Sequence, residues 1–486
     1  MPADDAPEPG LGQLPLRERA GLMFDRAMAE IDAGREPDGV VEAYATFLEL
    51  ADRHLAAGRR PAAAQAVTKA GRLAFNRVLH LHRSMSPIAA DPRGFTAPLR
   101  ESAVCRRLRA PRGRSGRPGD PVPGRPRRVL VVTRENANFL GEILSLLETE
   151  QGYDVRYLDL AKEHADLLEG ADTVRLMTRE ILTGENGLAD RVQDRLGPLL
   201  EWADVVFVEW CIAHAVLLNL ADPGDTRVIV RLHSYEAFTG WPHLLDFSRV
   251  DDLLFVSEHL RDLVADAVPA LSEEHAPRTH VLPLNLHLEP YRRPKPDDAR
   301  FTLGLVGWSA AAKDPLWAVE VLRAVRRQDP RYRLMLVGSP FDDAISAATR
   351  AYGERLWREL DELEAEGAVV RVAKTDDVPA VLEEVGVVLS TSVRESFHAG
   401  LVEGAASAAV PVVRDWPYFA GRTTSARTLF PADWVVTTPE EAAARVLRAT
   451  ADVDEWRAAG EAAAAHAMDT WDWEVTRAGY LDLFGS

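Results

Sequence analysis

The hydrophobic positions in the first part of the chain recur at helical spacing. Over residues 16–82, apolar side chains fall three or four positions apart, as they do at Val41, Tyr44, Phe47 and Leu48. Side chains with that spacing share one face of a helix. We therefore expect a helical accessory module over residues 1–105. Its first residues, about 1–14, are rich in Pro, Gly and acidic side chains and are predicted to be disordered.

A different pattern begins near residue 127. Short apolar runs, such as Val129–Val132 and Val385–Leu389, alternate with stretches of helical spacing. Such runs, flanked by helices, predict buried parallel strands, and the alternation predicts doubly wound sheets. We therefore expect an α/β protein with two Rossmann-like lobes followed by C-terminal helices. The expected boundaries are 129–297 for the first lobe, 298–455 for the second and 456–486 for the last helices.

The segment between the helical module and the first lobe is strongly basic. Residues 106–128 hold nine Arg, five Pro and four Gly, with Asp120 as the one acid. This composition predicts an extended linker. Its charge favours contact with the acidic protein body; anionic lipid heads are the alternative partner.

The overall charge limits the classes of partner. At −18, it argues against general nucleic-acid binding, because a phosphate backbone would be repelled. Cys105 and Cys211 are the only cysteines, which excludes a disulfide framework and a cysteine-rich zinc site. The start has no apolar core of a signal peptide, and no apolar run reaches spanning length. We expect a cytoplasmic protein, with peripheral contact at the inner face of a membrane as the open alternative.

Candidate chemistry gathers in the stretch ESFHAGLVEGAASAAVPVV, which begins at Glu395. It follows a predicted strand, and the small residues after Glu403 suit a helix packed closely on a sheet. Free backbone N–H groups at such a helix start favour phosphate oxygens. A carboxylate nearby is able to accept two hydrogen bonds from a cis diol such as a ribose. The plainer interpretation is that both acids complement the helix dipole.

The stretch resembles the nucleotide-sugar site of family 4 glycosyltransferases, which are retaining enzymes of the GT-B fold. Their signature is a Glu, seven residues, a second Glu, small residues and Pro-Val. The resemblance extends over about residues 129–486 and implies that the two lobes form a GT-B fold, with the last helices returning to the first lobe. It implies that Glu403 binds the donor ribose and that Glu395 contacts the sugar and stabilises its oxocarbenium-like state. The diphosphate would be held by the backbone amides of Phe397, His398 and Ala399.

A second motif occupies the place of the family's phosphate loop. Gly307 allows close backbone approach, and Lys313 is able to neutralise the diphosphate. The departure is Trp308, where the family usually has Arg; an aromatic ring is able to stack on a sugar. Three other arginines are candidates for the missing cation: Arg394, Arg231 and Arg134.

The first lobe contributes a histidine at the end of a predicted strand. His233 matches the family position that faces the donor sugar, so we expect it to orient that sugar. Glu236 and His214 are weaker candidates, and we also expect Gly141, in the first helix of this lobe, to contact the donor. Further matches to family positions are Ser257, Glu258 and Asn285.

No metal site or cofactor is expected. The only Asp-x-Asp triplet, Asp452-Val-Asp454, lies where acids suit a helix start. The leading hypothesis is a metal-independent, retaining, hexosyltransferase-like enzyme with a nucleotide-diphosphate sugar as donor. Its acceptor is unidentified: a glycan, a lipid-linked compound, a protein or a natural product.

Two alternatives remain open: another GT-B enzyme such as a nucleotide-sugar epimerase, and a catalytically silent sugar-nucleotide-binding scaffold that recruits a partner. The helical module faintly resembles one tetratricopeptide pair. It either caps or dimerises the protein or, in the sharper hypothesis, reads the acceptor.

Overall fold

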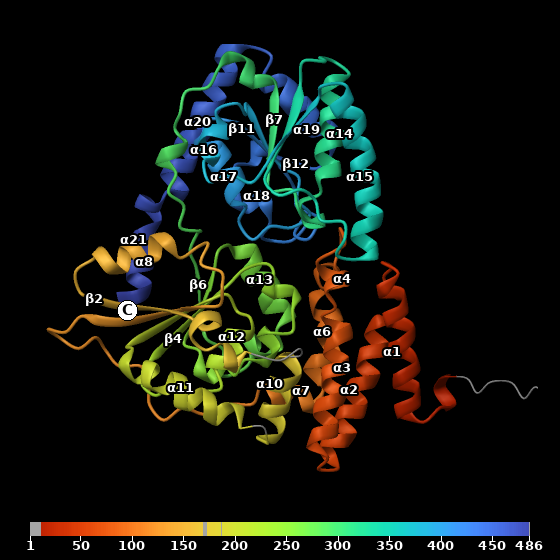
Figure 1. Ribbon diagram of the computed structural model, residues 1–486, viewed down its shortest axis with the longest axis vertical. Coiled ribbons are helices and arrows are strands. Elements are labelled where there is room, and N and C mark those ends of the chain that lie inside the picture. Colours follow the sequence, from red (N-terminus) through yellow and green to blue (C-terminus); the bar gives the residue numbers. More distant parts are fainter. Residues whose placement is uncertain (1–10, 169–172, 186, 486) are drawn as a thin grey trace, which may run out of the picture.

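The computed structural model describes residues 11–168, 173–185 and 187–485 (Figure 1). Of the segment predicted to be disordered, about residues 1–14, residues 1–10 lie outside the described part, and Leu11–Gln13 form a 3-10 helix, which corrects the prediction there. Residues 16–108 form the helical module, in which α2 and α3 pack side by side. Its core includes Tyr44, Phe47 and Leu48, as the spacing predicted. The helices are α1 (Leu16–Asp32), α2 (Val40–Ala56), α3 (Arg60–Ala74), α4 (Arg77–His80), α5 (Pro87–Ala90), α6 (Pro92–Glu101) and α7 (Ala103–Leu108).

The first lobe contains a six-stranded parallel sheet in the order β2-β1-β3-β4-β5-β6. Its strands are β1 (Arg127–Thr133), β2 (Tyr153–Asp159), β3 (Val205–Glu209), β4 (Arg227–Leu232), β5 (Asp252–Phe255) and β6 (Arg278–Val281). Its helices are α8 (Gly141–Thr149), α9 (Leu160–Glu163), α10 (Thr173–Thr183), α11 (Leu188–Trp202), α12 (Ala213–Leu218) and α13 (Glu258–Ala267). The apolar runs predicted as strands in this lobe are strands.

The second lobe repeats the architecture, with strand order β12-β11-β10-β7-β8-β9. Its strands are β7 (Thr302–Val306), β8 (Arg333–Val337), β9 (Val369–Val372), β10 (Val387–Ser390), β11 (Val410–Arg414) and β12 (Val435–Val436). Its helices are α14 (Pro315–Arg326), α15 (Ala347–Ala365), α16 (Val378–Leu382), α17 (Ala399–Ala406), α18 (Ala426–Leu429) and α19 (Pro439–Ala449). The predicted α/β architecture of two Rossmann-like lobes is confirmed.

Two segments cross between the lobes at one place. The chain after β6 runs up to the second lobe, and α20 (Val453–Trp471) leads back down to α21 (Trp473–Gly485). At the crossing, Leu286 bridges Asp472. The final helix packs on the first sheet, where Phe484 meets Phe207 edge to face at 5.4 Å. The final helix α21 therefore braces the first lobe, whereas α20, which the expected boundary at 456 placed in the returning tail, packs against α17 and β11 of the second lobe.

The basic linker lies along the first lobe. Arg114 Nη1 donates to both oxygens of the Asp251 carboxylate (3.0 and 3.1 Å), and Arg125 pairs with Asp204 at 2.6 Å. This is the contact with the acidic protein body that the composition favoured. The boundaries differ slightly from expectation, since α7 continues to Leu108 and β1 begins at Arg127.

The helical module touches both lobes (Figure 1). Its α3 and α6 pack on α10 and α13 of the first lobe. On the other side, the His80 carbonyl accepts a hydrogen bond from the Tyr418 hydroxyl at 3.5 Å, and the Ala89 carbonyl accepts one from Arg422 at 2.5 Å. The module therefore bridges the lobes beside the face where they meet.

Candidate functional site

Two loops of the second lobe bring Glu395 and Lys313 together. The Lys313 Nζ lies 2.6 Å from Glu395 Oε1, and the Ser392 hydroxyl donates to the same oxygen at 2.6 Å. Burial alone would raise the pKa of Glu395, but the charges of Lys313 and His398 and the hydrogen bonds from Lys313 and Ser392 outweigh it and lower the pKa to about 2. Glu395 is therefore an anion throughout the neutral range.

The phosphate-loop segment is fixed against the Glu395 loop by its backbone. The Val393 N–H donates to the Ala312 carbonyl at 2.8 Å, and the Thr391 hydroxyl donates to the Lys313 carbonyl at 2.5 Å. Gly307 has φ 76°, a left-handed conformation that glycine adopts without a steric penalty. These contacts hold Lys313 in place without using its ammonium group, which remains directed at Glu395.

The start of α17 carries polar groups with unused hydrogen-bonding capacity. His398 adopts φ 73°, which is strained for a residue with a side chain, and its Nδ1 is 2.6 Å from the Ser390 hydroxyl. Its Nε2 is buried, has no hydrogen-bond partner among the described residues and lies 4.0 Å from Glu395 Oε1. Nor do the backbone N–H groups of Phe397, His398 and Ala399 donate to any described residue. Such a helix start is suited to an anionic ligand.

Glu403 lies one turn into the same helix. Burial raises its pKa, and a hydrogen bond from Tyr291, in the crossing segment between the lobes, partly offsets the rise. The ring of Phe397 is fully buried and packs edge-on against Trp471 at 6.0 Å, so only its backbone faces the site. The acid predicted to hold a ribose is therefore already held by a neutral hydroxyl partner.

In the first lobe, His233 belongs to a buried ionic network that the sequence analysis missed. Its Nε2 lies 2.9 Å from Glu209 Oε1, and Arg231 Nε donates to Glu209 Oε2 at 2.6 Å. Burial raises the pKa of Glu209, but Arg231 and His233 outweigh it and lower that pKa. A signal for Glu209 existed, since it ends the strand beside the one that precedes His233. Acids at the carboxyl ends of neighbouring parallel strands share an edge of the sheet.

The ring of His233 packs against two aromatic side chains, whose own ring centroids lie 6.0 Å apart. Trp210 lies 4.2 Å away and Phe139 5.3 Å away, measured between ring centroids. Burial lowers the pKa of His233, so its imidazole is neutral. Because Nε2 faces the Glu209 carboxylate, that nitrogen carries the proton, and Nδ1 is left as an acceptor.

The weaker candidates of the first lobe, Glu236 and His214, form hydrogen bonds to the segments that carry Glu209 and His233. Glu236 accepts hydrogen bonds from the backbone N–H groups of Cys211 (3.0 Å) and His233 (3.3 Å), and burial raises its pKa to about 8. The His214 Nε2 donates to the Glu209 carbonyl at 2.7 Å. Asn285 accepts from Arg231 at 3.3 Å. These residues position the network and make no contact with Glu395.

The loops that carry His233 and Glu395 touch each other. Arg394 donates to the Ser234 hydroxyl at 3.4 Å, and His259 Nε2 donates to the Glu395 carbonyl at 3.0 Å. Ser234 directly follows His233, and Arg394 directly precedes Glu395. The two predicted catalytic residues therefore lie on facing loops. His259 was missed, although its neighbours Ser257 and Glu258 were noted.

Trp308 does not face these loops. It is 1% exposed and packs edge-on against Trp357 at 5.7 Å, inside the core of the second lobe. The expectation that its ring stacks on a sugar is therefore not met. Of the arginines proposed to replace the missing cation, Arg231 is already paired with Glu209. Arg134, at the end of β1, has a buried Nε without a hydrogen-bond partner in the described part of the chain, and Arg394 lies beside Glu395.

We expect Trp308→Phe to leave donor affinity within about twofold of wild type while costing about 1–2 kcal/mol of stability through lost core volume. A ring that stacked on the sugar would behave differently, because the smaller Phe surface would weaken binding. Isothermal titration with the donor, beside thermal unfolding, measures both quantities. The matched control is the same substitution at Trp456, which is buried in the same core of the second lobe.

The remaining predicted residues lie further out. Gly141 is exposed at the first position of α8. Asp452 caps α20 by accepting from the N–H groups of Asp454 and Glu455, the structural role expected of the Asp-x-Asp triplet. In the described residues, no group of three or more His, Cys, Asp or Glu side chains is placed to hold a metal ion. None of the helices described is long and apolar enough to cross a bilayer.

Solved structures with the same architecture exist. A glycosyltransferase from Rickettsia africae ESF-5 matches with a TM-score of 0.52 at 11% identity, covering 74% of this chain and 98% of its own. Anabaena Alr3699/HepE, in complex with UDP and glucose, matches with a TM-score of 0.53 at 16% identity, and the match covers 74% of this chain and 99% of HepE. The fold is GT-B. A trehalose-6-phosphate synthase studied for glycosyl transfer with retention matches with 0.52 at 15%, covering 74% and 98%. No family model and no curated protein matches the sequence.

The segments that follow β4 and β5 in the first lobe and β7 and β10 in the second lie at the facing edges of the two sheets. The first lobe supplies His233 and His259, and the second supplies Glu395, Lys313 and the start of α17. The GT-B fold implied by the sequence resemblance is confirmed. Membership of family 4 stays a prediction.

Proposed function

We propose that this chain transfers a sugar from a nucleotide-diphosphate donor to an acceptor, with retention of configuration and without a metal ion. The single observation that carries the proposal is the Glu395–Lys313 pair at the open start of α17, on the loop that contacts the His233 loop. There, Lys313 and the backbone amides at the start of α17 are placed to bind phosphate. Beside them, the Glu395 carboxylate is placed to stabilise a developing positive charge.

The chemistry would divide between the lobes as follows. The amides of Phe397, His398 and Ala399, together with Lys313, hold the diphosphate. As the bond from the anomeric carbon to the phosphate oxygen breaks, the electron pair leaves with the diphosphate and Lys313 stabilises its charge. Glu395 stabilises the positive charge at the anomeric carbon. The Nδ1 atom of the neutral His233 accepts a hydrogen bond from a sugar hydroxyl and orients the ring.

The similar structures support this proposal through what they bind and do. HepE is seen with UDP and glucose, and the trehalose-6-phosphate synthase transfers with retention. We infer a UDP-type donor as the first to test. The role of the helical module in capping, dimerisation or acceptor binding, and the acceptor itself, remain part of the hypothesis.

The direct test is a thermal-shift screen of nucleotide sugars on the full chain. A ligand present at about 100 times its Kd adds about 2.7 kcal/mol of stability, which is readily seen as a higher melting temperature. A donor found in this way is then incubated alone and with candidate acceptors, and released nucleotide diphosphate is measured. A chain that no nucleotide sugar stabilises would contradict the proposal.

We expect Glu403→Ala to weaken binding of the nucleotide diphosphate about tenfold or more, because losing the contacts to the ribose diol should cost about 1.5–3 kcal/mol. Since burial raises the pKa of Glu403 and the ionised carboxylate is the acceptor, wild-type affinity should fall as the pH falls through that raised pKa. The variant should lack this pH dependence. Calorimetry over a pH series measures both effects, with Glu320→Ala on the exposed face of α14 as control. Equal affinities would remove Glu403 from the site.

A further inference from the structure

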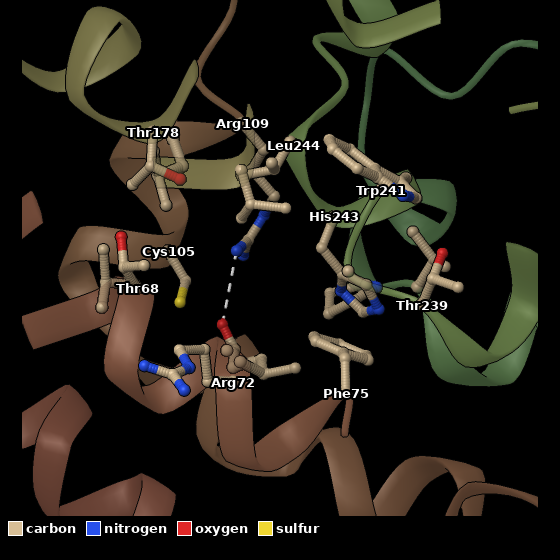
Figure 2. Close-up of a pocket in the computed structure, with 18 of the residues that line it drawn as sticks. Thr68, Arg72, Phe75, Cys105, Arg109, Thr178, Thr239, Trp241, His243 and Leu244 are labelled. Atoms are coloured by element: carbon tan, nitrogen blue, oxygen red, sulfur yellow. Dashed lines mark hydrogen bonds between the residues drawn. The ribbon is translucent and has the colours of Figure 1, made fainter. Parts of the chain in front are cut away.

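A second cavity lies between the helical module and the first lobe, apart from the site described above. It has a volume of about 460 Å³ and is walled by α3, α7 and α10 on one side and by residues 235–244 on the other (Figure 2). Tyr235 lines it, whereas Phe238, in the next turn of the same segment, faces Arg394 at 5.1 Å. Neither Glu395 nor His233 borders the cavity. Its volume is in the range of sites for small organic ligands.

Most of the wall is apolar. Val67, Leu99 and Leu108 come from the helical module, and Trp241 and Leu244 come from the first lobe. The ring of Phe75 stands at the floor, tilted against His243 at 4.7 Å. Such a surface favours an aliphatic or aromatic body that leaves water on binding.

The charged groups at the cavity are all of one sign. Three arginines line it, Arg72, Arg77 and Arg109, and no Asp or Glu is among the described residues that do so, although the whole chain carries −18. Arg72 and Arg77 are exposed, whereas Arg109 is 9% exposed and points into the cavity (Figure 2). Its Nε and Nη2 both lie 3.0 Å from the carboxylate of Glu273, an exposed acid outside the cavity, and its Nη1 donates to the Leu99 carbonyl at 3.4 Å. This local excess of positive charge favours an anion.

The imidazole of His243 points toward the same space as Arg109 (Figure 2). Its ring nitrogens make no hydrogen bond to any described residue. Burial, with Arg109 and Arg100 nearby, lowers the pKa of His243 to about 3, so the ring is neutral and has a donor and an acceptor to offer. A partly buried imidazole without a protein partner is an incomplete hydrogen-bonding site.

Gly71 keeps one wall open. It lies inside α3, where glycine costs roughly 0.5–1 kcal/mol of helix stability relative to alanine. A Cβ added there would meet no atom within 4 Å, so neither packing nor backbone conformation requires the glycine. The open space in front of the helix is what a larger side chain would remove.

From these observations we propose that the cavity binds a small amphipathic organic anion, an apolar chain that ends in one carboxylate or phosphate. The chain lies between Phe75, Leu99 and Trp241. The anionic group meets the arginines, and His243 contributes a hydrogen bond. The ligand would join the helical module to the first lobe and so stabilise their contact.

The test uses the full chain and four probes with the same ten-carbon body: decanoate, monodecyl phosphate, 1-decanol and 1-decylamine. Calorimetry and melting temperature are expected to show that an anion binds at least about fivefold more tightly than the alcohol or the amine, which is about 1 kcal/mol. The tighter of the two anions identifies the head group. Equal binding of decylamine and decanoate, or no binding by either anion, would overturn the proposal.

Two sets of variants locate the site. Gly71→Leu should fill the cavity and weaken anion binding at least about tenfold while leaving the affinity for UDP unchanged. Gly71→Met, whose unbranched side chain adapts to the space, is a second blocking variant. Gly21→Leu, at an equally open position in α1, is the matched control and should bind like wild type. Unchanged anion affinity in both folded Gly71 variants would place the binding elsewhere and overturn the proposal.

The charge part is tested by Arg72→Gln. Because this arginine is exposed, the variant should bind decanoate about twofold to fivefold more weakly than wild type and should bind decanol with unchanged affinity. Arg60→Gln, at the start of the same helix and outside the cavity, should change neither. A loss that is equal for decanoate and decanol would contradict a role for the arginine charge.

Discussion

Replacing Glu395 with Gln is expected to lower the rate of nucleotide release from the donor by about 10²–10³, the size of effect seen when one preorganised electrostatic contact is lost. Glutamine keeps the shape and the hydrogen-bonding capacity of the side chain and removes only its charge. That charge is firmly held, since Lys313 and Ser392 both contact one carboxylate oxygen at 2.6 Å. The measurement is release of nucleotide diphosphate from the donor found by thermal shift, with and without acceptors.

Donor affinity should change little in the same variant. Glu395 is aimed at charge that develops only in the transition state, so its loss should appear in turnover rather than in binding. Glu383→Gln, which changes a half-buried acid paired with Arg293 at 3.1 Å, is the control and should retain full activity. If wild-type protein released no more nucleotide than Glu395→Gln under every condition, the enzyme hypothesis would give way to the sugar-nucleotide-binding scaffold.

The fold was predictable because its signals are local. Buried parallel strands need uninterrupted apolar runs, and Val129–Val132 and Val387–Leu389 could be recognised without any partner strand. The order of strands along the chain then left few topologies, because parallel crossovers are right-handed and sequential strands lie close together. The basic linker was also predictable from its composition. Its contacts with Asp251 and Asp204 were not, because they depend on how the first lobe folds.

The second-lobe part of the site was predictable for a related reason. Glu395, His398 and Glu403 lie within one strand–loop–helix unit, so their spacing along the chain fixes their placement. Lys313 lies in a separate loop, and its role could be predicted only through the family resemblance. Its 2.6 Å contact with Glu395 depends on how β7 and β10 pair in the sheet.

Side-chain direction and long-range pairing were not predictable. Trp308 sits in the expected loop, but its ring turns into the lobe and packs on Trp357, which belongs to a distant helix. Glu209 and His259 acquire their roles from contacts with Arg231 and with the Glu395 backbone, and each contact joins segments far apart in sequence. Where the family that the sequence resembles usually has an arginine, this chain therefore has a core tryptophan.

The buried network behind His233 carries the largest expected effect on stability. Arg231→Met should lower the free energy of unfolding by about 3–5 kcal/mol, because it leaves the Glu209 carboxylate buried without its main cation. Both side chains are fully buried, and Arg231 also donates to Tyr480, in the returning helix α21, at 3.1 Å. Arg53→Met removes an exposed pair with Glu49 and should cost only about 0.3–0.5 kcal/mol, which makes it the control.

The pH dependence and a double variant separate this charge effect from lost packing. In wild type, Arg231 and His233 hold the pKa of Glu209 below its usual value, so the carboxylate contributes stability that is lost only as the pH falls through that lowered pKa. In Arg231→Met, the arginine charge no longer offsets the effect of burial, so the pKa of Glu209 should rise. Lowering the pH then neutralises the carboxyl, and the gap in unfolding free energy between wild type and variant should narrow.

Combining Arg231→Met with Glu209→Gln should recover much of the loss at neutral pH, since no uncompensated charge remains. Denaturant unfolding at several pH values measures these differences, and a gap that stayed constant with pH and in the double variant would show that Arg231 acts through packing and not through its charge.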